Sequence, residues 1–142
     1  MNLKKQIRKE MTIDHLNVAI YEQPEVMADN ASNFVEKNIK EAINKTGFAN
    51  IILATGSSQL LFLEALRNKD IDWKKITVFH LDEYKDISPN HPASFRKYLK
   101  DRILSFVNPK KVYFLNGNAA DCEKEMRKYE QILINHPIDI AC

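Results

Sequence analysis

Short apolar runs rich in β-branched and aromatic residues alternate along this chain with longer stretches in which apolar residues recur every three or four positions. Several of the short runs are apolar on successive residues, a pattern typical of strands covered on both faces, as in a parallel sheet. The longer stretches are typical of amphipathic helices. The alternation predicts a doubly wound α/β fold, Rossmann-like in three layers, with a mostly parallel sheet and helices on both of its faces.

The predicted elements can be bounded from local signals. The strands are predicted at Leu16–Tyr21, Asn50–Ala54, Ile76–Leu81, Val112–Leu115 and Ile138–Cys142. The first helix begins at Pro24, because proline suits a first helical turn, and ends at Gly47. Three further helices are predicted over about Ser58–Leu66, Pro92–Phe106 and Asp121–Asn135. The opening stretch, Asn2 to Met11, is interpreted as one more helix or a frayed arm.

Length and composition suit a single α/β domain over residues 1–142. Hydrophobic residues make up 44% of the chain and charged residues 28%, which is enough apolar material for a core. The sequence stops inside the predicted strand Ile138–Cys142, and a parallel strand needs neighbours to cover it. We therefore expect a truncated domain, whose uncovered strand favours a homo-oligomer over a clean monomer.

Charge and cysteine content exclude several classes of protein. The formal net charge is only +2, with basic and acidic residues interspersed, which argues against a nucleic-acid partner. No apolar run approaches the ~20 residues that span a bilayer, and the basic segment Met1–Glu10 lacks the apolar core of a secretory signal. The two cysteines, Cys122 and Cys142, fit a reducing compartment. The sequence predicts a cytoplasmic protein without a membrane partner.

The segment Thr55-Gly56-Ser57-Ser58 lies between a predicted strand and a predicted helix. Ligands of open α/β sheets bind beyond the carboxyl ends of strands, where a helix N-terminus offers free N–H groups to an anion. Gly56 lets the backbone approach a ligand, and the hydroxyls add donors. This segment is a candidate phosphate cradle, although it has neither Walker A nor dinucleotide-binding glycines. The alternative is a plain turn with Ser57 or Ser58 as N-cap.

Asp82, Glu83 and Tyr84 follow the predicted strand Ile76–Leu81. Burying two adjacent carboxylates at a strand end without partners costs free energy. Beside a substrate, the same carboxylates can take part in binding or catalysis. A partly screened carboxylate can abstract a carbon-bound proton next to a carbonyl. The alternative is capping by solvated acids. His80 is interpreted as a strand residue that faces a helix.

Two later segments are interpreted mainly as structural. Asn90-His91-Pro92-Ala93-Ser94-Phe95 is typical of a helix entry, and Leu115-Asn116-Gly117-Asn118 of a turn after a strand. No Cys/His cluster has metal-ligand spacing, so no metal is expected.

Four segments follow one another along the chain: a strand ending in Thr-Gly-Ser, then Phe-x-x-Asp-Glu-Tyr, then His-Pro-x-Ser-Phe, then Leu-Asn-Gly-Asn. With these segments in this order, the chain resembles the glucosamine-6-phosphate deaminase/isomerase family. That family lies within the superfamily that includes 6-phosphogluconolactonases. The resemblance runs from about Leu16 to Cys142 and covers the N-terminal part of the family. It implies conversion of glucosamine 6-phosphate and water to fructose 6-phosphate and ammonia, without metal or organic cofactor.

The resemblance also implies roles for residues of this chain. By motif match Asp82 is the general base working at C2 and C1 of the sugar. Thr55, Gly56, Ser57 and Ser58 match the loop that holds the phosphate, while Glu83 and Tyr84 match supporting positions. The partner implied is a small-molecule sugar phosphate.

Two departures from the family pattern affect these expectations. Ser58-Gln59 stands where the family usually shows Thr-Pro. This difference indicates a divergent subgroup, so the motif does not determine which sugar is the substrate. The family's second motif, a Gly-rich segment with an acidic residue followed by Gly-His, would begin after Cys142. It supplies the ring-opening groups, so the 142 residues are expected to be inactive alone.

Three alternatives stay open at this point. One is a 6-phosphogluconolactonase-like hydrolase, which typically has Gly-Asp-Glu-Arg where this chain has Leu81-Asp82-Glu83-Tyr84. Another is a non-catalytic sugar-phosphate-binding module. The third, a generic nucleotide-binding domain, is disfavoured by the absent glycine fingerprints.

Overall fold

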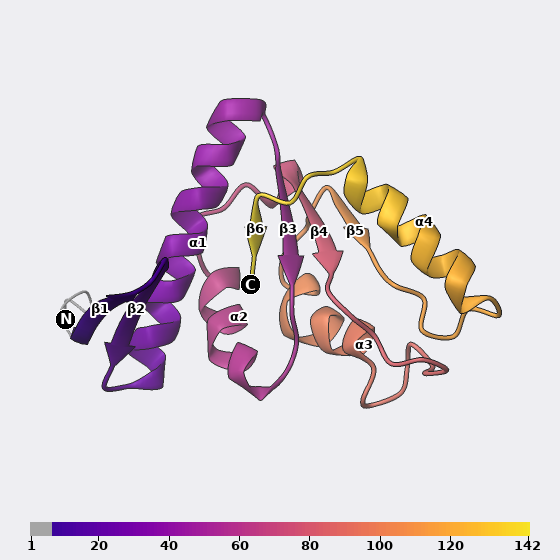
Figure 1. Ribbon diagram of the computed structural model, residues 1–142, viewed down its shortest axis with the longest axis horizontal. Helices are drawn as coiled ribbons and strands as arrows, with labels where there is room; N and C mark the ends of the chain where they lie inside the picture. Colours follow the sequence, from indigo (N-terminus) through magenta and orange to yellow (C-terminus); the bar gives the residue numbers. More distant parts are fainter. Residues whose placement is uncertain (1–6) are drawn as a thin grey trace.

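The computed structural model describes residues 7–142. A four-stranded sheet with strand order β5-β4-β3-β6 lies at its centre, and every neighbouring pair in this sheet is parallel. Its strands are β3 (Ala49–Leu53), β4 (Ile76–His80), β5 (Lys111–Tyr113) and β6 (Ile140–Ala141). The helices are α1 (Pro24–Thr46), α2 (Leu60–Arg67), α3 (Phe95–Leu99) and α4 (Cys122–Ile134). Figure 1 shows the sheet between α1 on one side and α4 on the other.

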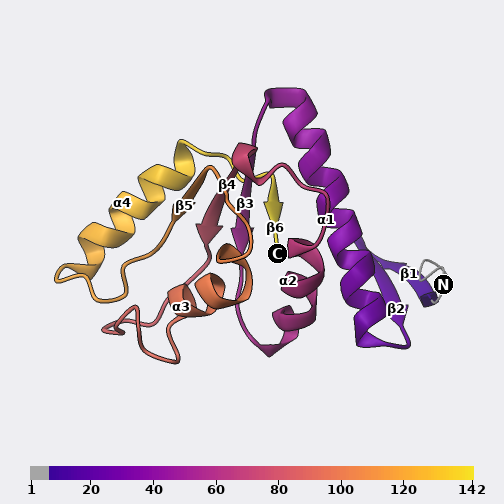
Figure 2. The same ribbon diagram turned by 180° about the vertical axis from the view of Figure 1, so that it is seen from behind.

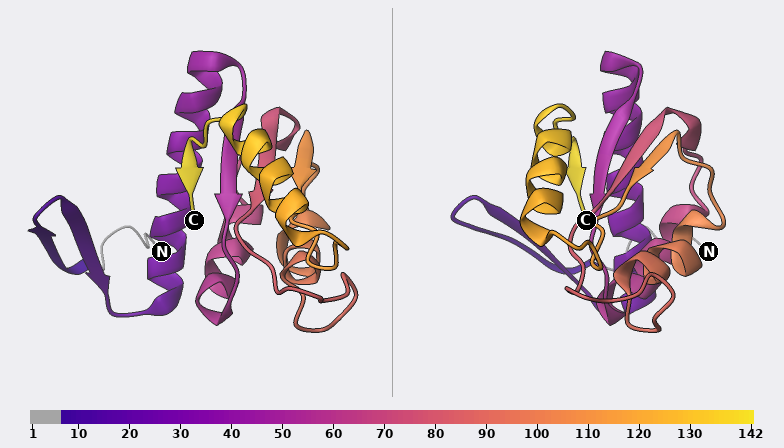
Figure 3. Two further views of the ribbon diagram at one scale, coloured as in Figure 1. Left: turned by 45° about the vertical axis from the view of Figure 1, so that its right-hand side comes forward. Right: turned by 90° about the vertical axis from the view of Figure 1, so that its right-hand side faces the viewer.

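Helices cover both faces of the sheet, as the sequence predicted. On one face Ile51, Leu53 and Val78 pack with side chains of α1, α2 and α3 in the main core cluster. On the other face Phe79 stacks on Tyr113 at 5.2 Å between ring centroids and meets the edge of Tyr129 of α4 at 6.5 Å. Figure 3 shows α4 on the opposite side of the sheet from α2 and α3. The doubly wound α/β prediction is confirmed.

The N-terminal part of the chain departs from its predicted structure. From Ile7 the segment is a strand, β1 (Ile7–Ile13), which pairs antiparallel with β2 (Leu16–Tyr21). The helix or arm expected over Asn2–Met11 is therefore wrong from Ile7 onward, and residues 2–6 lie outside the described residues. Asp14 turns the hairpin with φ 54°, in the left-handed region that Asp tolerates.

The strand predicted at Leu16–Tyr21 exists, but it is not part of the parallel sheet. Its side chains are mostly exposed on both faces, so it has no buried face to give to a central sheet. The hairpin lies beside α1, at the end of the molecule farthest from α4 (Figures 1 and 2).

The third predicted helix changes type along its length. Residues Phe95–Leu99 are α-helical, and a π-helical turn follows over Lys100–Leu104. The wider turn closes with the Ser105 N–H donating to the Lys100 carbonyl at 3.0 Å. Leu99 and Ile103 both stay fully buried through this change, so the segment keeps its apolar face on the core.

Candidate active site

Two loops that carry candidate residues begin at the same edge of the sheet. In the β3–β4 ladder Leu53 is opposite His80, and the Leu81 N–H donates to the Leu53 carbonyl at 3.2 Å. The loop after β3 carries Thr55 to Ser58, and the loop after β4 carries Asp82 to Tyr84. Both therefore leave the carboxyl ends of adjacent parallel strands, where α/β folds bind ligands.

The loop after β3 turns at Gly56, whose φ of 119° disfavours any residue with a Cβ. The carbonyl of Gly56 accepts hydrogen bonds from the Gln59 N–H at 3.1 Å and from the Tyr98 hydroxyl at 2.7 Å. Ser57 and Ser58 are exposed at the start of a short 3₁₀ turn, Ser57–Gln59, that runs into α2. The first N–H groups of such a segment have no partner inside it, which leaves them for an anion.

The two adjacent acids after β4 have opposite surroundings. The Asp82 side chain is exposed and makes no hydrogen bond or ion pair within residues 7–142. The Glu83 side chain is only 1% exposed and forms an ion pair with Arg96, whose Nε lies 3.0 Å from Glu83 Oε2. The Asp82 carboxylate is thus available to contact a ligand, whereas the Glu83 carboxylate is already bonded to other residues of the protein.

Glu83 accepts five hydrogen bonds. Its Oε2 accepts from the Ser94 hydroxyl at 2.8 Å and from the Arg96 N–H at 3.1 Å and Nε at 3.0 Å. Its Oε1 accepts from the Phe95 N–H at 2.9 Å and the Tyr84 N–H at 3.1 Å. Burial alone would raise the pKa of Glu83, but the donors of Phe95, Arg96, Ser94 and Tyr84 outweigh it and lower the pKa to about 2. Glu83 therefore caps the N-terminus of α3 as a carboxylate that is ionised at neutral pH.

Arg96 joins this carboxylate to another part of the same loop and to the loop after β5. Its Nη1 donates to Asn116 Oδ1 at 3.0 Å, and its Nη2 donates to the Ile87 carbonyl at 2.8 Å and to Asn118 Oδ1 at 3.3 Å. A Cβ on Gly117 would lie 2.3 Å from the Tyr84 carbonyl oxygen, so glycine is required for this close approach. Three segments that were separate motifs in the sequence form one polar cluster around the buried Glu83–Arg96 ion pair.

The low pKa of Glu83 predicts an acid-dependent stability. The folded pKa of about 2 lies below the usual value of 4.5, so the stabilisation is fully present above pH 4.5 and is lost as the pH falls toward 2. A shift of this size corresponds to about 3 kcal/mol of unfolding free energy. Urea titrations between pH 6 and pH 2 measure it. The Glu83→Gln variant should show a shallower pH dependence, and an identical slope in both proteins would contradict the assignment.

His80 ends β4 as a fully buried residue, and no described residue is a hydrogen-bond partner of its ring nitrogens. Burial lowers the pKa of His80, against the opposing charges of Glu83 and Asp82, so the ring is neutral at physiological pH. Its ring meets Phe114 at 5.7 Å between centroids. The Tyr129 hydroxyl donates to the His80 carbonyl at 2.7 Å and accepts from the His80 N–H at 3.0 Å. The strand end that precedes Asp82 is thereby held by α4.

Tyr84 and Thr55, the remaining predicted site residues, lie on the same two loops. The Tyr84 side chain is 54% exposed, and its ring lies 4.8 Å from that of Phe95. Thr55 is half-buried. Sequence reasoning missed Arg96 and Tyr98 of α3, which bind these loops, and Tyr129 of α4, which binds the end of β4. The only local signal for them was a charged or phenolic side chain on the apolar face of a predicted helix.

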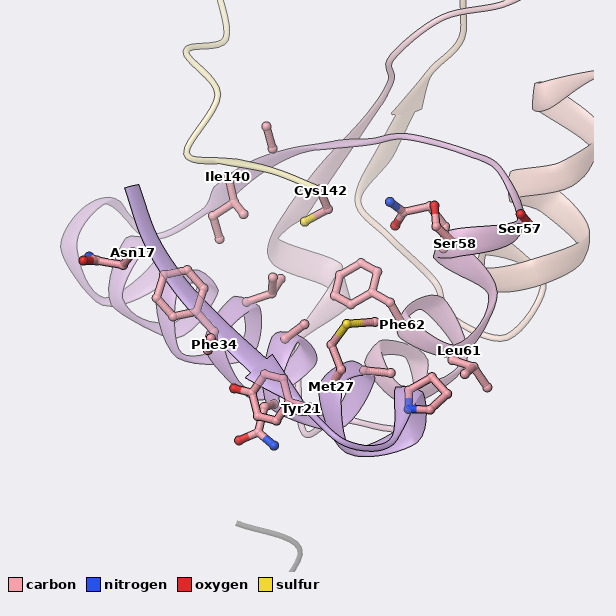
Figure 4. Close-up of a pocket in the computed structure, with 18 residues that line it drawn as sticks. Asn17, Tyr21, Met27, Phe34, Ser57, Ser58, Leu61, Phe62, Ile140 and Cys142 are labelled. Atoms are coloured by element: carbon pink, nitrogen blue, oxygen red, sulfur yellow. The ribbon is translucent and has the colours of Figure 1, made fainter. Parts of the chain in front are cut away.

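A mainly apolar groove of about 830 Å³ runs between β2, α1, the start of α2 and β6. Tyr21, Met27 and Phe34 line one side, and Ile140 and Cys142 line another (Figure 4). Ser57 and Ser58 lie in its wall, but Asp82, Thr55 and Gly56 do not. The groove therefore adjoins the candidate phosphate loop without reaching the candidate base.

Within residues 7–142 the structure contains no group of three or more His, Cys, Asp or Glu side chains placed to hold a metal ion. In the same part of the chain, no helix has the length and apolar character needed to cross a membrane.

Comparison with known proteins adds independent findings. The family described as glucosamine-6-phosphate isomerases/6-phosphogluconolactonase matches residues 22–141. The glucosamine-6-phosphate deaminase of Bacillus cereus (strain B4264) is 29% identical over 125 residues, which cover 88% of this chain and 46% of that protein. That of Bacillus thuringiensis (strain Al Hakam) matches with the same identity and coverage. This chain thus spans about half the length of the curated relatives it matches.

Solved structures share the fold. A monomeric glucosamine-6-phosphate deaminase aligns with a TM-score of 0.70 at 28% identity, covering 80% of this chain and 48% of that one. A 6-phosphogluconolactonase from Shewanella baltica aligns with a TM-score of 0.74 at 20% identity, covering 85% of this chain and 53% of that one. The second likeness concerns the fold alone.

Proposed function

Because this chain belongs to the family of glucosamine-6-phosphate isomerases and 6-phosphogluconolactonases, we propose that it carries the base and the phosphate loop of a glucosamine-6-phosphate deaminase. One observation supports this most: of two adjacent acids at the strand end, Glu83 is buried and saturated with donors, while Asp82 is exposed and unpaired. A carboxylate held at a pKa of about 2 is a poor proton acceptor, so the base role falls to Asp82.

In the proposed reaction Asp82 moves one proton. With the sugar in its open form, the Asp82 carboxylate takes the proton from C2, and the electron pair of that C–H bond forms the C1=C2 double bond of an enolamine as the C1 carbonyl oxygen takes up a proton. Asp82 then returns a proton to C1, which leaves an imine at C2. Water adds to the imine carbon, and the C–N bond breaks to release ammonia and fructose 6-phosphate. No redox partner is needed, because the substrate's own carbonyl receives the electrons.

The loop after β3 is proposed to hold the phosphate. Gly56 permits close backbone approach, and the exposed Ser57 and Ser58 offer hydroxyl and N–H donors at a helix start. Thr55 completes the loop by motif match. Glu83 and Tyr84 are proposed to support the site, Glu83 by fixing the loop that carries Asp82 and Tyr84 by packing on Phe95.

The complete reaction is proposed for a polypeptide that contains this chain together with ring-opening groups. The relatives are about twice as long as this chain. From the motif resemblance, we expect the ring-opening groups outside the 142 residues. A sugar-phosphate substrate also supports the proposal of a cytoplasmic location. Self-association is proposed on the strength of the apolar groove, which continues onto the short edge strand β6.

A polypeptide of these 142 residues should bind glucosamine 6-phosphate and release ammonia from it at a rate near the uncatalysed one, because catalytic groups that act as a unit are strongly non-additive. Heteronuclear NMR titration measures binding at Ser57–Gln59, an ammonia assay measures turnover, and light scattering gives the mass. Absence of binding would contradict the proposed function. Hydrolysis of 6-phosphogluconolactone without ammonia release would instead favour the lactonase reaction. Robust ammonia release from a 16.5 kDa monomer would contradict both the inactivity and the self-association.

A further inference from the structure

A single helical turn, Ser94–Tyr98, contacts both of the loops that carry candidate site residues. Its N-terminal end binds the loop after β4 through Ser94 and Arg96, which donate to the Glu83 carboxylate. Its other end binds the loop after β3, where the Tyr98 hydroxyl donates to the Gly56 carbonyl at 2.7 Å. We propose that Ser94–Tyr98 is a spacer that sets the phosphate loop relative to Asp82, and that Tyr98 is a positioning residue for phosphate binding. The proposal rests on the proposed function.

The contact of Tyr98 selects one orientation of a peptide unit. In a trans peptide the C=O and N–H groups point in opposite directions. Because the Gly56 carbonyl is held by Tyr98, the Ser57 N–H of the same unit points away from α3. Glycine accepts either sign of φ, and a Cβ on Gly56 would meet nothing within 4 Å. Within the loop, this peptide is held by the Gln59 N–H, which donates to the same carbonyl at 3.1 Å. The Tyr98 hydroxyl adds a shorter second hydrogen bond from outside the loop.

The other end of the spacer is firmly anchored. The Arg96 side chain is 8% exposed and bonds to two loops, to Glu83 and Ile87 on the loop after β4 and to Asn116 on the loop after β5. Tyr98 is two residues farther along the same helix, so anchoring Arg96 also fixes the backbone position from which the Tyr98 side chain extends. Burial also raises the pKa of Tyr98, which keeps the hydroxyl protonated and able to donate.

The separation that the spacer sets between Asp82 and the phosphate loop bears on which substrate length can bind. In a hexose 6-phosphate three carbons separate C2, where the proton is removed, from C6, which bears the phosphate. A base and a phosphate loop held at a fixed separation therefore favour one sugar length. Loosening Tyr98 should weaken phosphate binding while leaving the Asp82 carboxylate untouched.

The test compares Tyr98→Phe with Tyr113→Phe in the 142-residue chain. Tyr113 is a matched control because its hydroxyl has no hydrogen-bond partner among residues 7–142 and its ring packs on Phe79. Amide hydrogen exchange is measured without ligand at Gln59, whose N–H donates to the Gly56 carbonyl at 3.1 Å. Dissociation constants are measured for inorganic phosphate and for glucosamine 6-phosphate. Loss of one hydrogen bond should speed the exchange about fivefold and weaken both dissociation constants by about the same factor. Tyr113→Phe should change neither.

The two readouts separate the spacer from the proposed function. If the parent chain binds neither phosphate nor glucosamine 6-phosphate, the proposed function and the phosphate-positioning role of Tyr98 both fail, while the ligand-free exchange still decides whether Tyr98 restrains the loop. Unchanged exchange in Tyr98→Phe overturns the spacer whatever the parent binds. Faster exchange with unchanged dissociation constants overturns the positioning role of Tyr98.

Discussion

Replacing Asp82 by asparagine should lower ammonia release from glucosamine 6-phosphate by about 10²–10⁴-fold in any active polypeptide that contains this chain, because a positioned general base contributes about that much. The amide keeps the shape of the side chain but cannot accept the C2 proton. Substrate binding should stay within a few-fold of the parent, since Asp82 makes no bond that holds the loop. Steady-state kinetics of ammonia release, together with exchange of the C2 proton with solvent, measure both effects.

The matched control is Asp86→Asn on the same loop. Asp86 is exposed and has φ 59°, a conformation that asparagine adopts as readily as aspartate, so the loop should keep its form. Its activity should equal that of the parent. Turnover of Asp82→Asn within a few-fold of the parent would show that Asp82 is not the general base. That result would favour the alternative that this chain is a non-catalytic sugar-phosphate-binding module.

The Glu83→Gln variant should lose about 3 kcal/mol of unfolding free energy, because removing one partner of a buried ion pair leaves the other charge uncompensated. Arg96 would stay buried at 8% exposure, and the amide of glutamine would face the donors of Phe95 and Arg96. For a domain of this size such a loss lowers the thermal midpoint by about 10 °C. Calorimetry and urea unfolding at pH 7 measure the change.

Glu123→Gln provides the comparison on the surface. Glu123 pairs with Arg127 at 3.4 Å, and both side chains are more than 70% exposed. Exposed pairs contribute little, so the thermal midpoint should not change measurably. Equal midpoints for Glu83→Gln and Glu123→Gln would show that the buried cluster is not what stabilises the end of β4.

The parallel sheet was largely predictable because its two central strands, β3 and β4, are short and buried on both faces. Ile76–His80 is apolar or buried at every position, and such a run has few alternatives to a central parallel strand. The hairpin was not predictable from Ile7–Ile13, since this strand is mostly exposed and carries no alternation to set it apart from a polar helix. The switch from α-helix to π-helix at Lys100 also leaves no mark on the apolar pattern, because Leu99 and Ile103 are buried in either geometry.

The candidate site was predictable only where it is local. Thr55 to Ser58 and Asp82 to Tyr84 lie directly after strands, so the chain order alone places them at one sheet edge. The difference in burial and bonding between Asp82 and Glu83 depends on Arg96, which is 13 residues beyond Glu83, and the Gly56 carbonyl is bound by Tyr98, 42 residues away. Contacts of that sequence separation come from tertiary packing and have no local signature.

The hydroxyl of Tyr129 has a consequence for the order in which the molecule folds. It bonds to the N–H and carbonyl of His80 and also donates to the Tyr113 carbonyl at 3.3 Å, just where the β4–β5 ladder ends at the pair Phe79 and Tyr113. Tyr129 follows His80 by 49 residues, so these bonds wait for closure of a long loop. We therefore expect the strand end that leads to Asp82 to be completed only after α4 has docked, later than the apolar core of β3 and β4.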